Sequence, residues 1–176
     1  VHVEDPVPGD IFDWPGRMNV VRYGLDEWRK LFTPRQLLAL TTFSDLLADV
    51  RAEVERDAVD LPDDGVPLRD GGTGRTAYAD AVVTYLAFVV DKCTDYWSSI
   101  STWASQGGFI RNTFARQAIP MTWDFTETNP FSSSTGNWMA MVDWVTKVVS
   151  ELPMGPAGTT VQRDARARIA EVGSCV

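Results

Sequence analysis

Histidine and cysteine are scarce in this chain of 176 residues: His2 is the only histidine, and Cys93 and Cys175 are the only cysteines. A zinc finger or zinc ribbon needs four such ligands at short spacings, so the chain cannot build one by itself. A Ser–His–Asp or Cys–His active site needs a histidine held deep in the fold, which a single histidine at the second position does not supply. We therefore expect no metal site and neither of these catalytic centres.

Positive charge and long apolar runs are also in short supply. The 16 lysines and arginines are outnumbered by 24 aspartates and glutamates, which gives a net charge of −8. A non-specific nucleic-acid binder needs a positive field that releases counterions, so only a local basic patch would fit that class. The longest nearly apolar run, 77–90, contains Asp80 and is too short to cross a bilayer. Because no secretory signal opens the chain, we expect a cytoplasmic protein that does not enter a membrane.

Aromatic residues, by contrast, are plentiful. The chain has seven tryptophans and eight phenylalanines, within an otherwise globular composition of 44% apolar and 23% charged residues. Its length suits a single domain with its own core. So many large rings predict either a well-filled core or a surface that binds a partner, and they leave self-association open.

The start of a first helix can be identified from its cap. Thr33 is a good N-cap residue, Pro34 suits the first helical position, and Gln36 can complete a capping box with the backbone of Thr33. Apolar residues then recur every three or four positions as far as Val54, which predicts an amphipathic helix. The turn-forming residues of 60–74 predict a loop after it.

The same periodicity predicts two further helices. One covers about 75–106 and ends at a glycine cap, Gly107-Gly108, and the other covers about 138–152. The segments between them are expected to be a short helix at 109–117, an ambiguous stretch at 121–131 and a loop at 129–136.

The two ends of the chain differ from this helical middle. Prolines and the lack of periodicity predict that residues 1–22 form an extended arm. Residues 158–163 are strand-like, and a lone strand has nothing to pair with, which indicates that the chain stops inside a larger fold. We expect a mainly α fold, a helical bundle of about three principal helices plus short helices. Its parts would be the arm (1–22), a helical domain (23–152) and a C-terminal linker segment (153–176).

Arg111, Asn112 and Arg116 form one candidate site. Arginines at this spacing on a short helix can hold phosphates through paired N–H groups, and an asparagine can bind adenine. Ion pairs with the many acidic residues of the chain are the commoner explanation for such arginines, so both interpretations stay open.

Two other short patterns could carry chemistry. Asp124 and Glu127 would share a helix face, as a general acid–base pair requires, but a solvated face or a cap explains them more simply. Residues 129–131, Asn-Pro-Phe, partly match the motif with which amino-methyltransferases hold a flipped base. One proline of that motif is missing, and an Asn-Pro turn is the simpler explanation.

Several segments together resemble a known family. In chain order they are 23–25, Trp28, 31–37, Asp91-Lys92, Asp95-Tyr96, 112–121, 123–125, 129–132 and 136–138. This ordered set resembles the middle of the large bacterial adenine-specific DNA methylases that contain a zinc ribbon, a family listed under a domain of unknown function and seen in phage-defence contexts. The resemblance covers roughly residues 20–172 and is more specific than any single motif in it.

The resemblance implies that the chain is the helical insert of a DNA adenine-N6 methyltransferase that uses S-adenosylmethionine. In that family the S-adenosylmethionine loop and the zinc ribbon precede this region, and the Asp-Pro-Pro-Tyr catalytic motif follows it. We therefore expect the chain to be inactive and to bind no cofactor by itself. Its partners would be the rest of the methyltransferase chain and, through it, DNA, and its C-terminal segment would belong to the larger α/β methyltransferase fold.

The resemblance also implies roles for individual residues. DNA binding would fall to Arg111, Asn112 and Arg116, and Asp164 would approach the cofactor. The residues that would shape the target pocket are Trp123, Asp124, Asn129, Phe131 and Asn137.

Other classes of function stay open. A non-enzymatic module could use its tryptophans to anchor a partner protein, or the chain could be a degenerate remnant of a methylase. A carboxylate enzyme built on Asp124 and Glu127 is a third interpretation. The chain starts at Val1 and ends at Val176, about where the catalytic strand would begin, which predicts an excised or truncated piece of a longer protein.

Overall fold

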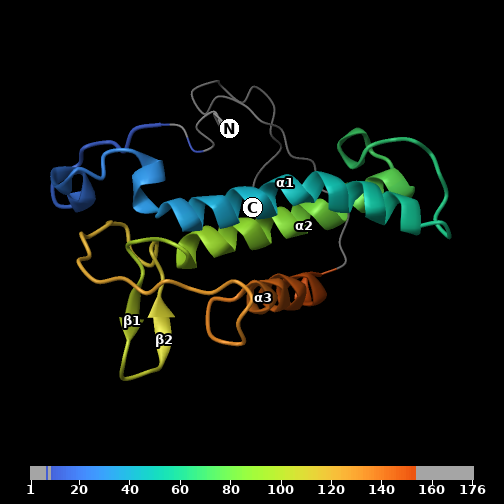
Figure 1. Ribbon diagram of the computed structural model, residues 1–176. Helices are drawn as coiled ribbons and strands as arrows, with labels where there is room; N and C mark the ends of the chain where they lie inside the picture. Colours follow the sequence, from blue (N-terminus) through green and yellow to red (C-terminus); the bar gives the residue numbers. More distant parts are fainter. Residues whose placement is uncertain (1–6, 8, 154–176) are drawn as a thin grey trace.

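The structure of the protein is a computed structural model that describes residue 7 and residues 9–153. Within this range the fold is mainly helical, with three α-helices and one antiparallel sheet of two strands (Figure 1), so the mainly α prediction is confirmed. The elements are η1 (Asn19–Tyr23), η2 (Trp28–Leu31), α1 (Pro34–Asp57), η3 (Leu68–Asp70), α2 (Arg75–Tyr96), β1 (Thr102–Ala104), β2 (Phe109–Arg111) and α3 (Trp138–Glu151), where η denotes a 3-10 helix. None of the described helices combines the length and the apolar character needed to cross a membrane. The strand-like segment 158–163 and Asp164 lie outside the described residues.

α1 begins where its cap predicts. The Gln36 N–H donates to Thr33 Oγ1 at 3.3 Å, and the Thr33 N–H donates to Gln36 Oε1 at 2.8 Å. Pro34 occupies the first helical position, where no N–H is needed. The capping box and the helix that follows it are confirmed, and so is the loop between Asp60 and Gly74 apart from η3.

α2 is shorter than its periodicity predicts, because it ends at Tyr96 instead of continuing to about 106. Just beyond its end, Ser98 Oγ accepts hydrogen bonds from the N–H groups of Ile100 (3.1 Å) and Ser101 (3.2 Å). The Ser101 hydroxyl donates to the Ser98 carbonyl at 2.9 Å. These short-range serine bonds give the backbone an alternative to helical bonding, so they end the helix although the apolar spacing continues.

The glycines predicted to cap that helix instead turn a β-hairpin. Gly107 and Gly108 both donate their N–H groups to the Ala104 carbonyl, and Gly108 has φ +65°, in the left-handed region that glycine adopts without strain. The predicted short helix at 109–117 is wrong. Residues 109–111 form β2, which pairs with β1 in the register Thr102↔Arg111, Trp103↔Ile110 and Ala104↔Phe109. The loop at 129–136 and the helix from Trp138 are confirmed.

Each α-helix runs antiparallel to the α-helix that precedes it in the chain. Thr76 at the start of α2 contacts Glu55 at the end of α1, and Trp97, which follows α2, contacts both Phe43 of α1 and the Gly136 carbonyl before α3. Their shared core consists of Leu40, Val89, Cys93, Trp97 and Met141. Phe43 stacks on Trp138 with ring centroids 4.3 Å apart, which links α1 to α3 across this core.

A second apolar cluster lies at the end of the molecule where α2 ends. It consists of Ile11, Val20, Leu31, Ile100 and Ile119. A parallel bridge pairs Met18 with Ile119, so residues 9–22, which the sequence predicts to be part of an arm, pack beside the segment that follows the hairpin. The tryptophans do not fill these cores as a group. Trp97 is the one buried tryptophan of the described residues, and Trp14, Trp103, Trp123 and Trp144 are exposed.

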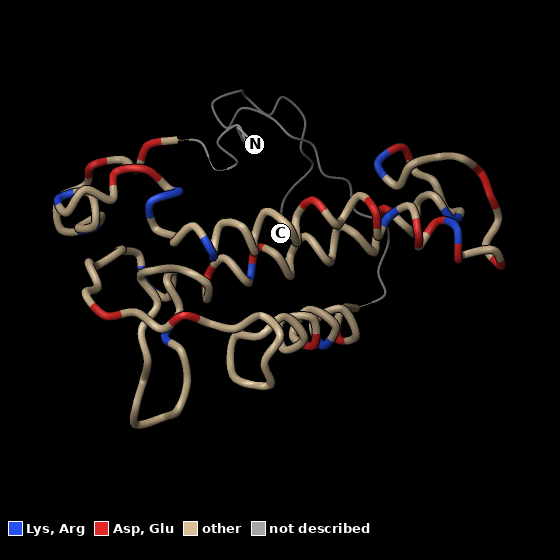
Figure 2. The backbone as a smooth tube through the Cα atoms, in the orientation of Figure 1, with Lys and Arg blue, Asp and Glu red and all other residues tan. Residues whose placement is uncertain are grey.

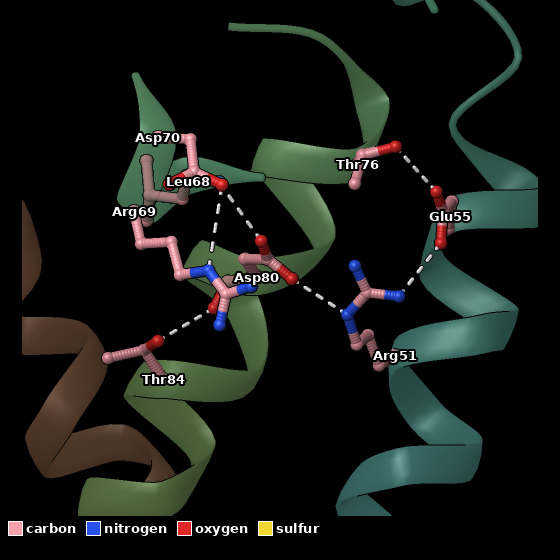
Figure 3. A network of polar contacts seen from close by, with 8 residues as sticks. All are labelled: Arg51, Glu55, Leu68, Arg69, Asp70, Thr76, Asp80 and Thr84. Atoms are coloured by element: carbon pink, nitrogen blue, oxygen red, sulfur yellow. Dashed lines mark hydrogen bonds and ion pairs between the residues drawn. The ribbon is translucent and has the colours of Figure 1, made fainter. Parts of the chain in front are cut away.

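Asp80 joins α1, α2 and the loop between them. Its Oδ2 accepts a hydrogen bond from the Leu68 N–H at 3.0 Å, and its Oδ1 accepts one from Arg51 Nε at 2.7 Å (Figure 3). Arg51 also donates to Glu55, which accepts a bond from the Thr76 hydroxyl at 2.6 Å. The Leu68 N–H and the Arg51 guanidinium hold the pKa of Asp80 below its ordinary value of 3.8.

We expect Asp80→Asn to lower the free energy of unfolding by about 1 kcal/mol at neutral pH, because a charged acceptor bonds more strongly than a neutral one and partial exposure weakens the effect. A carboxyl whose pKa is lowered by folding stabilises the fold above its ordinary pKa, and that contribution is lost as the pH falls through the folded pKa. The difference in the free energy of unfolding between Asp80→Asn and wild type should therefore shrink below about pH 3.8. Urea unfolding across the acid range measures it, with the exposed Asp91→Asn on α2 as the charge control. A difference that stays constant with pH would contradict this role.

Candidate functional site

The segment that carries the predicted DNA-binding residues is fixed to the end of α2 by Asp95. This carboxylate is only 9% exposed, and it accepts hydrogen bonds from Asn112 Nδ2 at 2.6 Å, from the Phe114 N–H at 2.8 Å and from Lys92 Nζ at 3.2 Å. The Asp95 carbonyl accepts a further bond from the Thr113 N–H at 2.8 Å. Asn112 therefore uses its amide to hold the loop in place.

Arg111 and Arg116 flank this anchored segment. Both are exposed, and neither guanidinium has an ion pair or hydrogen bond within the part of the chain that the structure describes. The ion pairs that the sequence offered as the commoner explanation are therefore not formed there. The two arginines do not share a helix, because Arg111 belongs to β2 and Arg116 to a turn.

Sequence reasoning missed two more arginines at the same end of the molecule. The bridge between Met18 and Ile119 brings Arg17 close to the segment that holds Arg116, and the Ile119 N–H donates to the Arg17 carbonyl at 2.7 Å. Arg22 lies on η1. Like Arg111 and Arg116, both lack an ionic partner among the described residues. The only signal for this grouping is a contact between residues about a hundred positions apart, which no local pattern reveals.

Exposed aromatic rings accompany these four arginines. Trp123 packs edge-on against Tyr23, which follows Arg22 on η1, with ring centroids 5.2 Å apart. Phe114 and Trp14 are exposed as well. We call this region the arginine–aromatic end and define it by Arg17, Arg22, Arg111 and Arg116 with the rings Trp14, Tyr23, Phe114 and Trp123. In Figure 1 its segments lie around the blue N-terminal turns and the yellow hairpin, beyond the end of α2.

Elsewhere in the described chain, most lysines and arginines pair with a carboxylate. Figure 2 shows acidic and basic residues distributed along the helix pair and its outer loop. Arg29 and Lys30 donate to Glu27 and lower its pKa from 4.5 to about 2. Asp13 and Asp124 lie near the arginine–aromatic end, so the end is not uniformly positive. What it offers an anion is a set of guanidinium groups that have no carboxylate partner among residues 9–153.

Asp124 and Glu127 do not form an acid–base pair. Glu127 is bound on both oxygens by Arg35 of α1, at 3.0 Å from Nε and 2.6 Å from the second nitrogen. Asp124 is exposed and makes no ion pair with a described residue. Two carboxyl groups suit acid–base work when their environments separate their pKa values around one substrate, and this arrangement does not provide that.

The Asn129-Pro130-Phe131 segment forms a turn. Asn129 Oδ1 accepts a hydrogen bond from the Phe131 N–H at 3.0 Å, and the Asn129 carbonyl accepts one from the Ser132 N–H at 3.2 Å. Phe131 is exposed, with its ring 6.1 Å from that of Phe43. This geometry agrees with the simpler of the two interpretations, a local Asn-Pro turn.

The other residues expected to shape a pocket are dispersed. Asn137 caps α3, because its Oδ1 accepts a hydrogen bond from the Ala140 N–H at 2.9 Å. Trp123 lies on Tyr23, at the arginine–aromatic end. A groove of about 490 Å³ brings Asn129 and Glu127 together with Gln36, whose buried Nε2 has no hydrogen-bond partner in the described part of the chain. Trp123, Asp124, Phe131 and Asn137 do not line that groove.

Besides the arginine–aromatic end, the described chain has an apolar groove lined by Tyr85 and Phe88 of α2 and by Trp144 and Val148 of α3. No group of three or more histidine, cysteine, aspartate or glutamate side chains within residues 9–153 is placed to hold a metal ion. The searches of family models, curated proteins and solved structures found no match to this chain.

Proposed function

We propose that this chain is a non-catalytic helical module that helps to hold DNA for an adenine-N6 methyltransferase, and that the arginine–aromatic end makes the contact. The observation that carries the proposal is that one end of the fold carries four exposed arginines that have no carboxylate partner among the described residues. A guanidinium binds phosphate through two parallel N–H groups, and an exposed ring offers a base a stacking surface. A surface with both features suits a nucleic acid whose bases are accessible.

The anchoring of the loop supports the same function. Asp95 holds Asn112, Thr113 and Phe114, which lie between Arg111 and Arg116. A loop that is fixed before binding loses less conformational entropy when it contacts a ligand. The net charge of −8 opposes long-range attraction of DNA, so the module would contribute positioning, and the rest of the methyltransferase would contribute most of the affinity.

The methyltransferase context comes from the family resemblance. In this proposal S-adenosylmethionine and the catalytic motif belong to the rest of the parent protein.

We expect the Arg111→Ala/Arg116→Ala variant to bind DNA more weakly than wild type and with a flatter salt dependence. Each lost phosphate contact reduces the slope of log K against log salt by about 0.9 for duplex DNA, so two lost contacts should reduce it by roughly 2. Fluorescence anisotropy of a labelled duplex, and of the same strand unpaired, measures both quantities between low and moderate salt.

The matched control is Arg56→Ala/Arg69→Ala. It removes the same charge from two exposed arginines at the far end of the helix pair. It should leave the slope within about 0.5 of wild type, because its arginines touch no phosphate in this proposal. Equal losses in the two double variants would mean that only the total charge matters and would remove the arginine–aromatic end from the interface.

A further inference from the structure

α3 is apolar on two sides, and one of them is largely exposed in the described structure. Met141 and Val142 face the shared core. Trp144, Val148 and Leu152 are exposed large apolar residues on the same helix. Such a face costs free energy in water unless something covers it, and contiguous exposed apolar surface of this kind commonly marks an interaction site.

The exposed side of α3 forms one wall of a groove whose other wall is α2. Tyr85 and Phe88 of α2 face Trp144, Val148 and Leu152 across a groove of about 540 Å³. A smaller apolar cavity of about 230 Å³, between Val82 of α2 and Val142 of α3, shares Tyr85, Val145 and Val149 with it. Because they share these lining residues, we treat the two together and call them the α2–α3 groove. From Val142 to Leu152 it follows α3 for about 15 Å, nearly three helical turns.

The charged residues that line the groove are both lysines. Lys92 lies 5.4 Å from the centroid of the Trp144 ring and is paired with Asp95. Lys147 makes no ion pair with any described residue. Asp143 and Glu151 of α3 are exposed but do not line the groove. In a chain with a net charge of −8, this groove presents apolar surface bordered by positive charge.

We propose that the α2–α3 groove binds an amphipathic α-helix of a partner protein whose apolar face is bordered by carboxylates. A helix offers side chains at positions i, i+3 or i+4 and i+7, which span about 10 Å and fit a groove of this length. Carboxylates at the edge of that helix would complement Lys147 and Lys92. This inference does not depend on the proposed contact with DNA.

The same observations argue against two other occupants. In a symmetric contact with a second copy of the chain, one concave groove would meet another, so neither groove would be filled. A lipid surface is flat, whereas the groove is concave, and the net charge of −8 opposes contact with an anionic membrane. A helix with acidic borders satisfies both the shape and the charge of the site.

The test uses two synthetic helical peptides of about 18 residues, roughly five turns, with the same leucine face. One carries glutamates and the other lysines at the border positions. By fluorescence anisotropy with the full chain, we expect the glutamate peptide to bind roughly tenfold more tightly than the lysine peptide. Lys147→Glu should abolish or reverse this preference. Binding of neither peptide, or a preference that Lys147→Glu leaves unchanged, would overturn the proposal.

A pair of matched variants locates the site. Val148 is 61% exposed in the groove, and Leu38 is 68% exposed on α1 outside it, so both can be changed to glutamate without disturbing a core. Val148→Glu should weaken binding of the glutamate peptide by roughly tenfold, and Leu38→Glu should leave that binding unchanged. Circular dichroism establishes that both variants fold. Equal weakening by the two substitutions would place the binding outside the groove.

Two further measurements can overturn the choice of occupant. Sedimentation velocity of the chain alone would show a concentration-dependent dimer that Val148→Glu abolishes if a second copy fills the groove. Flotation with phosphatidylserine vesicles would show binding that the same variant abolishes if the groove meets a membrane. We expect a monomer at micromolar concentration and no flotation. A dimer would mean that a second copy of the chain occupies the groove, and flotation would mean that a membrane does; either result would overturn the proposed helical partner.

Discussion

Replacing Trp97 by alanine is expected to lower the free energy of unfolding by about 3–5 kcal/mol, the range found when a large aromatic side chain is removed from a core. Its side chain is 1% exposed, and its ring lies 5.7 Å from that of Phe43. It packs in the cluster that joins all three α-helices. Because a domain of this size is stable by only about 5–15 kcal/mol, the variant should be close to unfolding at 37 °C.

The indole hydrogen bond contributes separately from the packing. Trp97 Nε1 donates to the Gly136 carbonyl at 2.7 Å, immediately before the N-cap of α3. Trp97→Phe keeps most of the ring volume but leaves that buried carbonyl without its donor, so we expect a loss of about 1–3 kcal/mol. The two variants together apportion the effect between core volume and the connection to α3.

Urea unfolding followed by circular dichroism measures both losses. Trp123→Ala is the control, because that tryptophan is exposed and Tyr23 is its one aromatic neighbour among the described residues. The substitution should cost no more than about 1 kcal/mol. If Trp97→Ala were no more destabilising than Trp123→Ala, the three helices would not depend on this residue as the structure indicates.

The parts of the fold that could be predicted from the sequence are those fixed by neighbouring residues. The capping box of α1 needs only Thr33 and Gln36, and α3 begins at a capping asparagine, Asn137, before a strongly periodic stretch. Turn residues between Asp60 and Gly74 likewise act within a few positions of themselves. Each of these signals depends on hydrogen bonds of short range, so no tertiary information was needed.

The end of α2 shows where periodicity misleads. Tyr96, Ile100 and Trp103 continue the helical spacing, yet the serine bonds around Ser98 and Ser101 redirect the chain into a hairpin. Two residues at helical spacing can both face an apolar cluster without lying on one helix. Ile100 does so from a turn, in the cluster built on Val20 and Leu31.

The candidate site could be predicted only in part for the same reason. Arg111 and Arg116 were identifiable because they are close in sequence, but their expected helix is a strand and a turn. Arg17 joins them through the pairing of Met18 with Ile119, a contact that depends on the tertiary fold. The sequence contains only a weak indication of the α2–α3 groove, namely the apolar residues on both sides of α3. The same pattern equally predicts a helix that is buried on two sides.

Asp95→Ala is expected to cost about 3 kcal/mol, because it removes a nearly buried charge that accepts three hydrogen bonds. The Phe114 N–H and the Asn112 amide would lose their acceptor, and Lys92 would lose its partner. Asp95→Asn keeps one acceptor oxygen and the size of the side chain, so its loss should be smaller, about 1–2 kcal/mol. Urea unfolding measures both, and Asp91→Ala, which removes an exposed charge one turn earlier, is the control.

The region that loses protection in Asp95→Ala tests the role of Asp95 more sharply than the total loss of stability does. If this carboxylate anchors the loop, amide hydrogen exchange in Asp95→Ala should accelerate most over residues 112–116, while the amides of α1 and the first turns of α2 stay protected. DNA binding should weaken as well, although Arg111 and Arg116 are unchanged, because the arginines would then have to be ordered on contact. Faster exchange spread evenly over the three α-helices would show that Asp95 supports the whole fold instead of positioning this loop. If hydrogen exchange accelerated only over residues 112–116 while the DNA affinity stayed the same, Asp95 would still be the anchor of the loop, but the loop would not be part of the DNA interface.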